Sequence, residues 1–156
     1  MMNKAVFPGS FDPFTIGHAD LVKRGLKLFD EVIIAVGYNE HKAGWLPVEE
    51  RVRALRAYYA DTSGVTVESY NDLTVDFAIR HETGFILRGV RCIKDYEYEA
   101  GIADINKKLT GIETVILLSD PNMSAISSSA IRELHHFGRD ITPWLPRGLA
   151  YRFPNH

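Results

Sequence analysis

Short apolar runs rich in β-branched residues alternate along this chain with longer amphipathic stretches. Two of the runs, residues 33–36 and 115–118, are apolar at every position. A continuous apolar run is typical of a strand that is covered on both faces, as strands of parallel sheets are. Because parallel strands are joined by right-handed helical crossovers, the alternation predicts a doubly wound parallel sheet of the α/β class.

The same pattern predicts where the elements lie. We expect five strands, at residues 5–7, 31–37, 65–69, 84–88 and 114–118. We expect helices at residues 17–29, 48–59, 73–81, 96–109 and 128–136, and a short one after Pro143. Pro47 occupies the position of a first helical residue. With no linker or repeat, residues 1–156 are expected to form a single domain that buries roughly two-thirds of its unfolded surface.

Composition disfavours several classes of protein. The formal net charge is −2 and no basic block is present, which argues against a nucleic-acid binder. Cys92 is the only cysteine, so neither an intrachain disulfide nor a cysteine metal cage can form. No apolar run approaches the roughly 20 residues of a membrane span, and the first residues have no signal-peptide pattern. We therefore expect a cytoplasmic protein that binds neither nucleic acid nor membrane.

Polar clusters follow every predicted strand. They lie at residues 10–18, 39–45, 70–74, 88–91 and 120–129. Ligands of open parallel sheets bind outside the carboxyl ends of the strands, which is where these five clusters would meet. The sequence therefore predicts one site at that edge of the sheet.

The first cluster places a histidine at a helix entrance. Thr15, Gly17 and His18 follow a glycine-containing turn, where free N–H groups and the helix dipole suit negative charge. The dipole disfavours imidazolium, so a neutral His18 would donate a hydrogen bond to a phosphate oxygen without acting as a base. The alternative is that Thr15 only caps the helix and that His18 lies on its surface.

Two further clusters suit phosphate. Arg88 and Arg91 flank Gly89 at a strand end, and the planar fork of arginine makes bidentate phosphate contacts. The alternative is a pair of surface arginines in weak ion pairs. Residues 127–129 are serines before a helix, where hydroxyls and free N–H groups can bind phosphate. Simple N-capping is the alternative for these serines, and both roles can hold.

Three residues are ambiguous when taken singly. Lys42 lies in the loop after the second strand, and Glu99 lies where it could accept a hydrogen bond from a ribose hydroxyl. Thr74 follows Asp72 at a helix entry, where backbone groups could meet an elongated ligand. Each of them alone fits a solvated surface or a helix entry better. Neither G-x-G-x-x-G nor G-x-x-x-x-G-K-[ST] occurs, so a typical dinucleotide site and a P-loop are not supported.

Taken together, these residues resemble the bacterial phosphopantetheine adenylyltransferases, a family of the nucleotidylyltransferase superfamily, over nearly the whole chain. The motifs that carry the resemblance are Pro8-Gly9-Ser10-Phe11-Asp12-Pro13, Thr15-Ile16-Gly17-His18, Lys42, Glu49-Glu50-Arg51-Val52, Arg88-Gly89-Val90-Arg91, Asp95-Tyr96-Glu97-Tyr98-Glu99 and Ile126-Ser127-Ser128-Ser129. The Thr-x-Gly-His element marks the superfamily, and the later motifs in this order mark the family. The resemblance implies a Rossmann-like nucleotidylyltransferase fold with a five-stranded parallel sheet.

The resemblance also implies an activity. The family transfers the adenylyl group of ATP to 4′-phosphopantetheine, giving dephospho-CoA and pyrophosphate, with magnesium. By this resemblance His18 would stabilise the transition state. The residues that would bind the acceptor are Ser10, Lys42, Thr74 and Arg88. The residues that would bind ATP are Ser10, Phe11, His18, Gly89, Val90, Arg91, Glu99, Met123, Ser124, Ala125, Ile126, Ser127, Ser128 and Ser129.

The chemistry of these residues suits such a transfer. A phosphate acceptor is already anionic at neutral pH, so no general base is needed and catalysis reduces to alignment and electrostatic stabilisation. Magnesium would be held mainly through substrate phosphates. Two positions depart from the family pattern. Ser10 stands where many members have threonine, which keeps the hydroxyl, and Met123 stands where others often carry tryptophan, which leaves the packing of adenine open.

Two other functions and the assembly stay open. The chain could adenylylate or cytidylylate another phosphorylated acceptor, such as nicotinamide mononucleotide, or bind a nucleotide as a sensor without catalysis. The resemblance implies a homohexamer built as a dimer of trimers. Tyr96, Tyr98, Ile102 and Ile105 form an apolar set broader than one buried stripe requires, so part of it would face another subunit. The alternative is that all four serve the core of the monomer.

Overall fold

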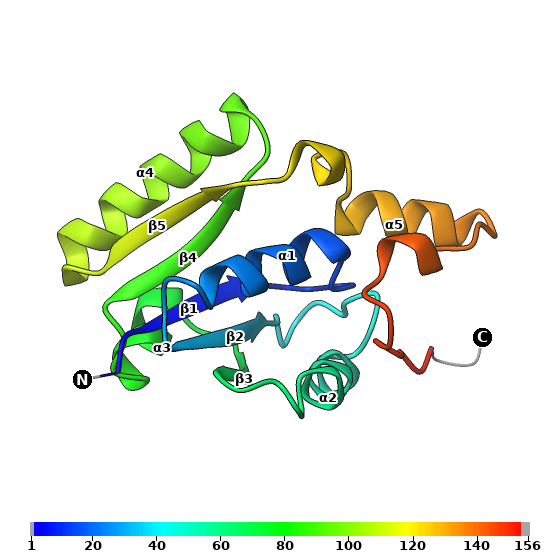
Figure 1. The fold of residues 1–156 in the computed structure, drawn as a ribbon, viewed down its shortest axis with the longest axis horizontal. Coiled ribbons are helices and arrows are strands. Elements are labelled where there is room, and N and C mark those ends of the chain that lie inside the picture. The colour runs from blue at the N-terminus through cyan, green and yellow to red at the C-terminus, as the bar shows by residue number, and fades with distance from the viewer. Residues whose placement is uncertain (1, 154–156) are drawn as a thin grey trace.

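The computed structural model describes residues 2–153, which contain one sheet of five parallel strands flanked by helices (Figure 1). The strands are β1 (Lys4–Gly9), β2 (Glu31–Gly37), β3 (Val65–Tyr70), β4 (Phe85–Val90) and β5 (Glu113–Leu118). The helices are α1 (Ile16–Gly25), α2 (Val48–Tyr58), α3 (Thr74–Arg80), α4 (Ile93–Thr110) and α5 (Ser128–His136), with single 3₁₀ turns η1 (Pro121–Met123) and η2 (Thr142–Trp144). The predicted fold class is confirmed.

The strand order β3-β2-β1-β4-β5 places a switch point beside β1. The chain builds outward from β1 to β3, then returns to lay β4 on the other side of β1, where Val6 pairs with Ile86. Connections that leave β1 and β4 in opposite directions open a crevice at the carboxyl ends of these strands. The strand arrows in Figure 1 end on the side of the molecule where α5 lies.

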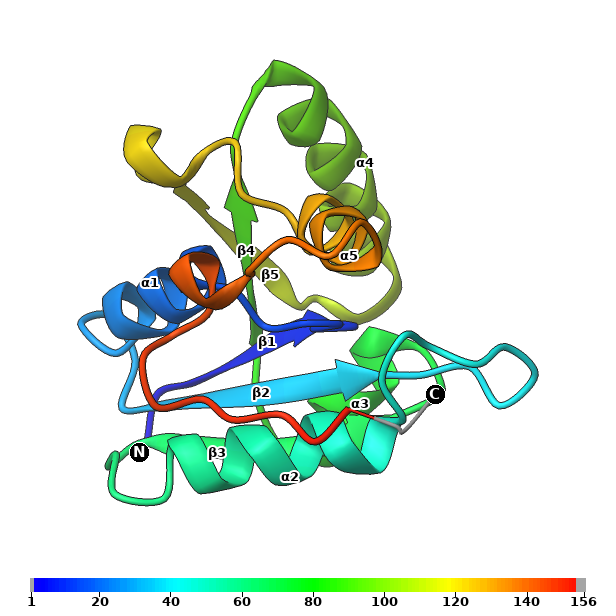
Figure 2. The same cartoon turned by 90° about the vertical axis from the view of Figure 1, so that its right-hand side faces the viewer.

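Two apolar clusters hold helices to the two faces of the sheet. On one face, Leu21 of α1 and Leu55 of α2 pack on the strands together with Leu149 from the C-terminal segment. On the other face, α3 contributes Val75 and Phe77. Figure 2 shows α1 on one side of the sheet and α3 and α4 on the other. Burying each of these large side chains contributes about 2 kcal/mol, so the packing fixes the edge at which the loops gather.

One of the two continuous apolar runs is not covered as predicted. Residues 33–36 lie in β2 and are buried throughout, which the prediction of a strand covered on both faces requires. Residues 115–118 lie in β5, an edge strand, where the side chains are half-buried and Leu118 is 70% exposed. The prediction is wrong for this run, because the helix beside β5 packs loosely. That helix is α4, whose only buried residue is Glu99.

Helix α1 is shorter than predicted. It ends at Gly25 rather than at residue 29, because the N–H groups of Lys27 and Leu28 donate to carbonyls three residues back and tighten the chain into a turn. Gly25 also lies against the sheet, since a Cβ there would come within 2.7 Å of Cδ2 of Leu87. The early turn returns the chain to the end of the sheet at which β2 begins.

Other boundaries differ by a few residues. Helix α4 begins at Ile93, three residues before the predicted start, and Pro47 is the N-cap of α2 rather than its first helical residue. The turn η1 was not predicted, and it begins where the side chain of Asp120 accepts from the N–H of Asn122 at 2.8 Å. None of the helices in the described part of the chain is both long and apolar enough to cross a membrane.

Candidate active site

Two cavities open next to each other at the carboxyl edge of the sheet. The first cavity, of about 370 Å³, is lined by the ends of β1 and β2 and by α3 and α4. The second cavity, of about 430 Å³, is lined by the ends of β1 and β4, by α1 and by the segment that leads into α5. Both are lined by Pro8, Gly9, Ser10, Arg88, Tyr98 and Glu99, a set that we call the shared wall. The predicted polar clusters therefore converge on one edge, in two adjoining cavities.

The centre of the shared wall is an ion pair between Arg88 and Glu99. Nε and Nη2 of Arg88 donate to the two carboxylate oxygens of Glu99 at 2.9 and 2.6 Å, and Nη1 donates to the carbonyl of Pro8 at 2.7 Å. Glu99 is only 7% exposed, so this pair is largely desolvated on the carboxylate side. The geometry makes Glu99 the group that orients Arg88, and a contact from Glu99 to a ribose stays a prediction.

His18 is built into the first turn of α1. Its backbone N–H donates to Oγ1 of Thr15 at 3.2 Å, and the backbone N–H of Thr15 donates to Nδ1 of His18 at 3.0 Å. These reciprocal bonds form a capping box in which the histidine takes the third helical position. Because Nδ1 accepts from a backbone donor, the neutral ring carries its proton on Nε2. His18 thus caps the helix and also lines the second cavity with a free donor.

The surroundings of His18 keep the ring uncharged. Burial and, to a lesser extent, the positive charges of Arg88 and Arg91 together lower the pKa of His18 to about 4. The aromatic rings of Phe11 and Phe14 lie 5.0 and 5.3 Å from the imidazole, centroid to centroid, and exclude water from two sides. The alternative of an ordinary surface histidine is therefore wrong, and a neutral ring is maintained throughout the physiological pH range.

Phe11 occupies a backbone conformation that suits this arrangement. Its φ of 48° lies in the left-handed region, which non-glycine residues rarely adopt. Its side chain is buried between the rings of Phe7 and Phe14, with centroids 5.1 and 5.3 Å away. Aromatic packing of this kind overcomes a conformational cost of about 1–3 kcal/mol and fixes the turn before His18.

The second predicted arginine, Arg91, lies between β4 and α4 and is oriented by a carboxylate in the first turn of α4. The backbone N–H and Nε of Arg91 donate to Oδ2 of Asp95 at 3.1 and 3.2 Å. The guanidinium is partly exposed and lines the second cavity, so it keeps donors free for an anion. Arg88 and Arg91 therefore differ: the first is held in the shared wall, and the second stands at the mouth of the second cavity.

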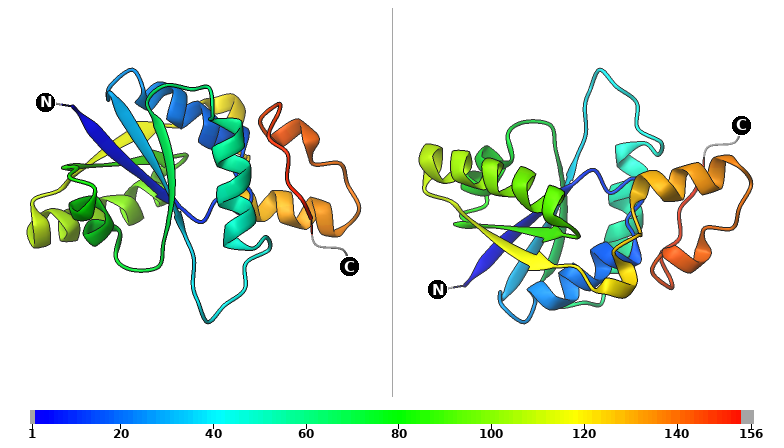
Figure 3. Two further views of the ribbon diagram at one scale, coloured as in Figure 1. Left: turned by 90° about the horizontal axis from the view of Figure 1, so that it is seen from below. Right: turned by 90° about the horizontal axis from the view of Figure 1, so that it is seen from above.

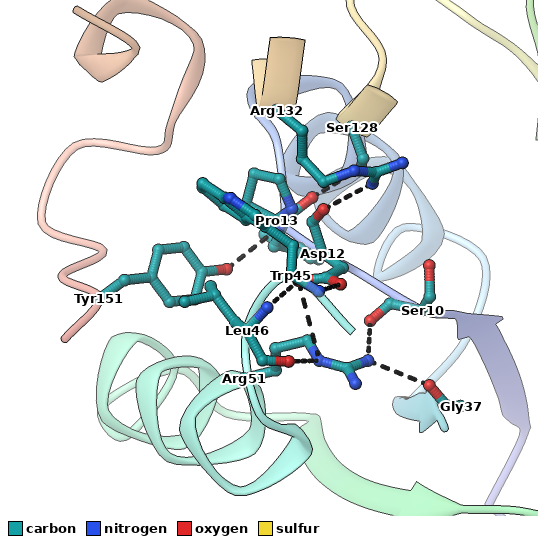
Figure 4. A network of polar contacts seen from close by, with 11 residues as sticks. Ser10, Asp12, Pro13, Gly37, Trp45, Leu46, Arg51, Ser128, Arg132 and Tyr151 are labelled. Atoms are coloured by element: carbon teal, nitrogen blue, oxygen red, sulfur yellow. Dashed lines mark hydrogen bonds and ion pairs between the residues drawn. The ribbon is translucent and has the colours of Figure 1, made fainter. Parts of the chain in front are cut away.

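The three serines at the start of α5 make different contacts. Ser127 is the N-cap, and its Oγ accepts from the N–H of Ala130 at 3.1 Å. Ser128 Oγ donates to the carbonyl of Pro13 at 2.7 Å, which ties α5 to the turn before His18 (Figure 4). Ser129 Oγ accepts from Nη2 of Arg132 at 3.1 Å. N-capping and a contact with the cavity both hold here, since Ser127 and Ser128 also line the second cavity.

The structure brings most, but not all, of the predicted residues to the cavities. The predicted acceptor residues that line the first cavity are Ser10, Thr74 and Arg88. The predicted ATP residues that line the second cavity are Ser10, Phe11, His18, Gly89, Arg91, Glu99, Met123, Ile126, Ser127 and Ser128. Four predicted ATP residues, Val90, Ser124, Ala125 and Ser129, line neither cavity. Val90 is instead buried in the core, since alternate residues of β4 point to opposite faces of the sheet.

Lys42 is the one predicted acceptor residue outside the cavities. It lies in residues 38–46, which we call the Lys42 loop, and this loop projects beyond the sheet between β2 and α2 (Figure 3). The loop is pinched by an antiparallel bridge in which the N–H of Lys42 donates to the carbonyl of Asn39 at 3.2 Å. Tyr38 and Asn39 of the loop line the first cavity, while Lys42 is exposed and lines neither cavity.

Sequence reasoning missed several residues of the first cavity. Tyr98, Ile102 and Asn106 lie one turn apart on α4, so the helix presents one edge to the cavity. The i, i+4 spacing was the signal that could have found them. Tyr70 also lines this cavity, and its hydroxyl is 2.9 Å from Oγ1 of Thr74, which fixes both side chains.

The donor set of the second cavity bears on metal binding. Within residues 2–153 no group of three or more His, Cys, Asp or Glu side chains is arranged to hold a metal ion. The carboxylates of Asp20, Asp95 and Asp120 line the second cavity, and Asp20 and Asp95 pair with Arg24 and Arg91. Such a set fits a divalent cation carried on phosphate oxygens and water, with carboxylates near it, better than a cage of protein ligands.

Comparison with known proteins gives full-length relatives. A family model described as cytidylyltransferase-like matches residues 6–134. The phosphopantetheine adenylyltransferase of Phocaeicola vulgatus is 52% identical over 148 residues, which cover 95% of this chain and 98% of the relative. The enzymes of the same name from Bacteroides fragilis and Flavobacterium johnsoniae are 49% and 46% identical, over 95% and 97% of this chain and 99% of each relative.

Solved structures share the fold at low sequence identity. A bifunctional NMN adenylyltransferase/ADP ribose pyrophosphatase from Francisella tularensis, complexed with AMP and a manganese ion, has a TM-score of 0.68 at 15% identity. The match covers 93% of this chain and 44% of that one, so this chain spans less than half of its length. A lipopolysaccharide core biosynthesis protein from Thermoplasma volcanium has a TM-score of 0.57 at 20% identity, over 77% of this chain and 98% of that one.

Proposed function

This chain belongs to the phosphopantetheine adenylyltransferases, within the cytidylyltransferase-like family, and on that premise we propose how its two cavities carry out the reaction. The reaction transfers the adenylyl group of ATP to 4′-phosphopantetheine and gives dephospho-CoA and pyrophosphate, in coenzyme A biosynthesis. We place 4′-phosphopantetheine in the first cavity and ATP in the second. The observation that carries this assignment is the shared wall, which lets two substrates approach one point from either side.

The first cavity suits a long, flexible acceptor with amide groups. Apolar contact comes from Tyr98 and Ile102, and hydrogen-bonding groups come from Thr74 and Asn106. Apolar walls with a few fixed polar groups are typical of small-molecule sites. In our proposal the pantetheine arm lies among these side chains. Its phosphate then lies at the shared wall, between the Ser10 hydroxyl and the Arg88 guanidinium, and the ammonium group of Lys42 reaches it from the projecting loop.

The second cavity suits a nucleotide. The N-terminus of α1 lines it, as do the residues that cap α5, so both helices direct free N–H groups and positive dipole ends toward a polyphosphate. Arg91 adds a guanidinium with free donors at the mouth. The adenine would pack on Met123 and Ile126, where the polarisable thioether replaces the aromatic ring that other family members carry.

The chemistry needs alignment rather than proton transfer. An oxygen of the acceptor phosphate attacks the α-phosphorus of ATP, and a new P–O bond forms. The bond from the α-phosphorus to the oxygen that bridges to the β-phosphate breaks, and its electron pair leaves with pyrophosphate. The Nε2–H of His18 donates to an oxygen of the α-phosphate as charge builds there, and Arg88 and Arg91 lower the repulsion between the two anions.

The neutrality of His18 is part of this proposal. An imidazole with a pKa of about 4 stays an uncharged hydrogen-bond donor at neutral pH. It therefore carries no second proton to give to the acceptor and does not bind phosphate as a cation. The backbone N–H of Thr15 holds the donor in one tautomer. The pre-set donor gives its largest benefit in the transition state, where the charge on the α-phosphate oxygens is greatest.

We include magnesium as the metal of the reaction. When bound to the phosphates of ATP it would neutralise charge and help pyrophosphate to leave. The residues that would lie near it are the carboxylates of Asp20 and Asp120 at the second cavity. Because the second cavity offers the cation few protein ligands, the cation would enter and leave with its substrate.

Our proposal extends to a cytoplasmic homohexamer built as two trimers. What supports the assembly is α4, where Ile93, Tyr96, Ile105 and Leu109 are all more than half exposed. Several large apolar side chains exposed on one helix are costly to leave in water and mark an interaction surface. Closed symmetry is the usual form of such self-association.

The assignment is tested by pyrophosphate release. With ATP and magnesium, 4′-phosphopantetheine should release pyrophosphate, whereas nicotinamide mononucleotide should not, and CTP should replace ATP poorly. The His18→Ala variant is the matched control for background hydrolysis. Release with nicotinamide mononucleotide at an equal rate would point to another acceptor, and nucleotide binding without release in any mixture would point to a sensor.

A further inference from the structure

A buried ion pair between Asp12 and Arg51 lies beneath the edge that carries both cavities (Figure 4). Arg51 is 4% exposed and Asp12 is 6% exposed, and the Nε of the arginine lies 4.0 Å from Oδ1 of the aspartate. Neither residue lines a cavity. A buried ion pair adds little net stability in comparison with apolar residues, so the main structural effect of this pair lies in the backbone segments that its two side chains hold.

Arg51 holds three backbone segments through their carbonyls. Its Nη1 donates to the carbonyls of Ser10 at 2.7 Å and Gly37 at 3.1 Å, and its Nε donates to the carbonyl of Leu46 at 3.0 Å. Gly37 ends β2 directly before the Lys42 loop, and Leu46 is the last residue of that loop. One guanidinium therefore holds both ends of the loop and connects them to Ser10 in the shared wall.

Asp12 holds the returning end of the same loop. Its two carboxylate oxygens accept from the backbone N–H groups of Trp45 at 2.7 Å and Leu46 at 2.9 Å. Its own carbonyl accepts from Nη1 of Arg132 at 2.8 Å, which joins this end to α5. Figure 4 shows these bonds reaching Asp12 from the Lys42 loop and from α5, and the ion pair reaching it from Arg51 of α2.

Gly44 confirms how tightly the loop is seated. A Cβ at this position would lie 2.8 Å from Oδ2 of Asp12, 3.0 Å from the carbonyl oxygen of Leu46 and 3.1 Å from Nη2 of Arg51. The backbone of the loop thus rests directly on the ion pair, with no room for a side chain. The pair and the loop form one packed unit whose free end carries Lys42.

We propose that Asp12 and Arg51 are positioning residues for the acceptor phosphate: they fix both ends of the Lys42 loop relative to Ser10, so that Lys42 and Ser10 reach that phosphate together. This inference rests on the proposed function, which places 4′-phosphopantetheine in the first cavity. The two residues touch neither substrate and act through the loop. A loop held at both ends loses less conformational freedom when Lys42 binds, and the acceptor gains that difference as affinity.

Three variants loosen the ion pair in different ways. Asp12→Asn removes the charge and sets an amide donor against a backbone N–H. Arg51→Lys keeps the charge and loses the planar fork. Gly44→Ala keeps both charges and pushes the loop away from them. Arg56→Lys is the matched control, since Arg56 lies on the same helix, donates to the carbonyl of Val67 at 3.0 Å and pairs with Glu68, away from the loop.

The readout separates positioning from general damage. For each variant we would measure kcat, the KM for each substrate and, by calorimetry without ATP, the Kd of 4′-phosphopantetheine. We expect the acceptor KM and Kd to rise about tenfold or more and the KM for ATP to change less than about threefold, with Arg56→Lys like wild type. Circular dichroism would verify that each variant is folded at the assay temperature. If Asp12→Asn and Arg51→Lys both unfold, Gly44→Ala carries the test.

A measurement of the coupling between Asp12 and Lys42 completes the test of the positioning role. In the Lys42→Ala background, Asp12→Asn should add less than about twofold to the acceptor KM, because residues that act as a unit are not additive. Equal losses for both substrates, or full additivity with Lys42→Ala, would overturn the positioning role and leave the proposed function standing. An unchanged acceptor KM in Lys42→Ala alone would instead remove Lys42 from the site, and this inference with it.

Discussion

The side chain of Leu21 in α1 fills the space that a Cβ on Gly89 of β4 would need, with its Cδ1 only 2.3 Å from that position. Real Cβ contacts do not come so close, so the helix lies as near to the strand as a glycine permits. Leu21 lies one turn after His18, on the same side of α1. Gly89, which has no side chain, therefore sets the separation between His18 and the two arginines, Arg88 and Arg91.

We expect Gly89→Ala to push α1 away from β4. The free energy of unfolding should fall by about 1–3 kcal/mol, as it does when a packed site is overfilled, and kcat should fall with it. Leu21→Ala frees the same space, so the double variant should regain part of the loss caused by Gly89→Ala. Urea unfolding of the wild type, both single variants and the double variant measures this coupling, and simple addition of the two losses would contradict it.

His18→Ala should lower turnover far more than binding. In our proposal the lost donor acts mainly on charge that develops during transfer, so we expect kcat to fall about 100- to 1,000-fold while the Kd of ATP changes only a few-fold. Single-turnover kinetics and nucleotide titration measure the two effects separately. A matched loss of affinity with unchanged kcat would make His18 an ordinary ligand contact.

The lowered pKa of His18 makes stability depend on pH in a defined direction. The folded chain releases this proton near pH 4 and the unfolded chain near 6.5, so between those values protons bind the unfolded state better. The contribution is present above about pH 6.5 and is lost as the pH falls toward 4. Between pH 7.5 and 5.0 it amounts to at most about 2 kcal/mol.

This pH effect is measured by comparing variants. The free energy of unfolding of the wild type should fall more between pH 7.5 and 5.0 than that of His18→Gln, which cannot take up the proton. His136→Gln, at an exposed position on α5, should behave like wild type. The same fall in His18→Gln as in the wild type would place the titrating group elsewhere.

Lys42→Ala should affect the two substrates unequally. We expect the KM for 4′-phosphopantetheine to rise about tenfold or more, and the KM for ATP to rise much less, because our proposal places the ammonium group on the acceptor phosphate. Lys42→Arg should restore little, since a forked guanidinium does not replace a point charge. Steady-state kinetics with each substrate varied in turn decides the matter, and equal effects on both KM values would place Lys42 between the substrates.

Light scattering at micromolar concentration should give a mass of about six protomers of 17.6 kDa. Ile105→Glu introduces a charge on the exposed apolar side of α4 and should lower that mass. Leu28→Glu, at a residue that is also more than half exposed but lies after α1, is the control and should leave the mass unchanged. A wild-type mass near 17.6 kDa would exclude the hexamer and leave the catalytic proposal untouched.

The sheet was predictable because its signals are local. The run at residues 33–36 has no polar residue, and β2 and α5 begin and end where the pattern predicts. The end of α1 was not predictable, because periodicity continues past Gly25 while a tight contact with Leu87 turns the chain. The exposure of Leu118 was also hidden, since strand composition does not state which strand lies at an edge.

The site was predictable where one residue type suits one chemistry. Thr15 and His18 in a helix start predict a neutral donor; burial and the nearby arginines keep the ring neutral, and the capping box sets its tautomer. The roles of Asp12 and Arg51 could not be read in the same way, because their partners are backbone groups far along the chain. Such contacts depend on how loops pack and leave no fixed spacing in the sequence.

The placement of β4 beside β1 also determines when the site comes into existence as the chain folds. The bond from Arg88 to the carbonyl of Pro8 joins residues 80 positions apart, across the pairing of Val6 with Ile86. Strands β1 to β3 pair through shorter crossovers, and closing a longer loop carries a larger entropic cost that slows it. A nascent chain that ends before β4 thus has three of the five strands and lacks the wall that both cavities need, so catalytic activity reports the completion of folding rather than its beginning.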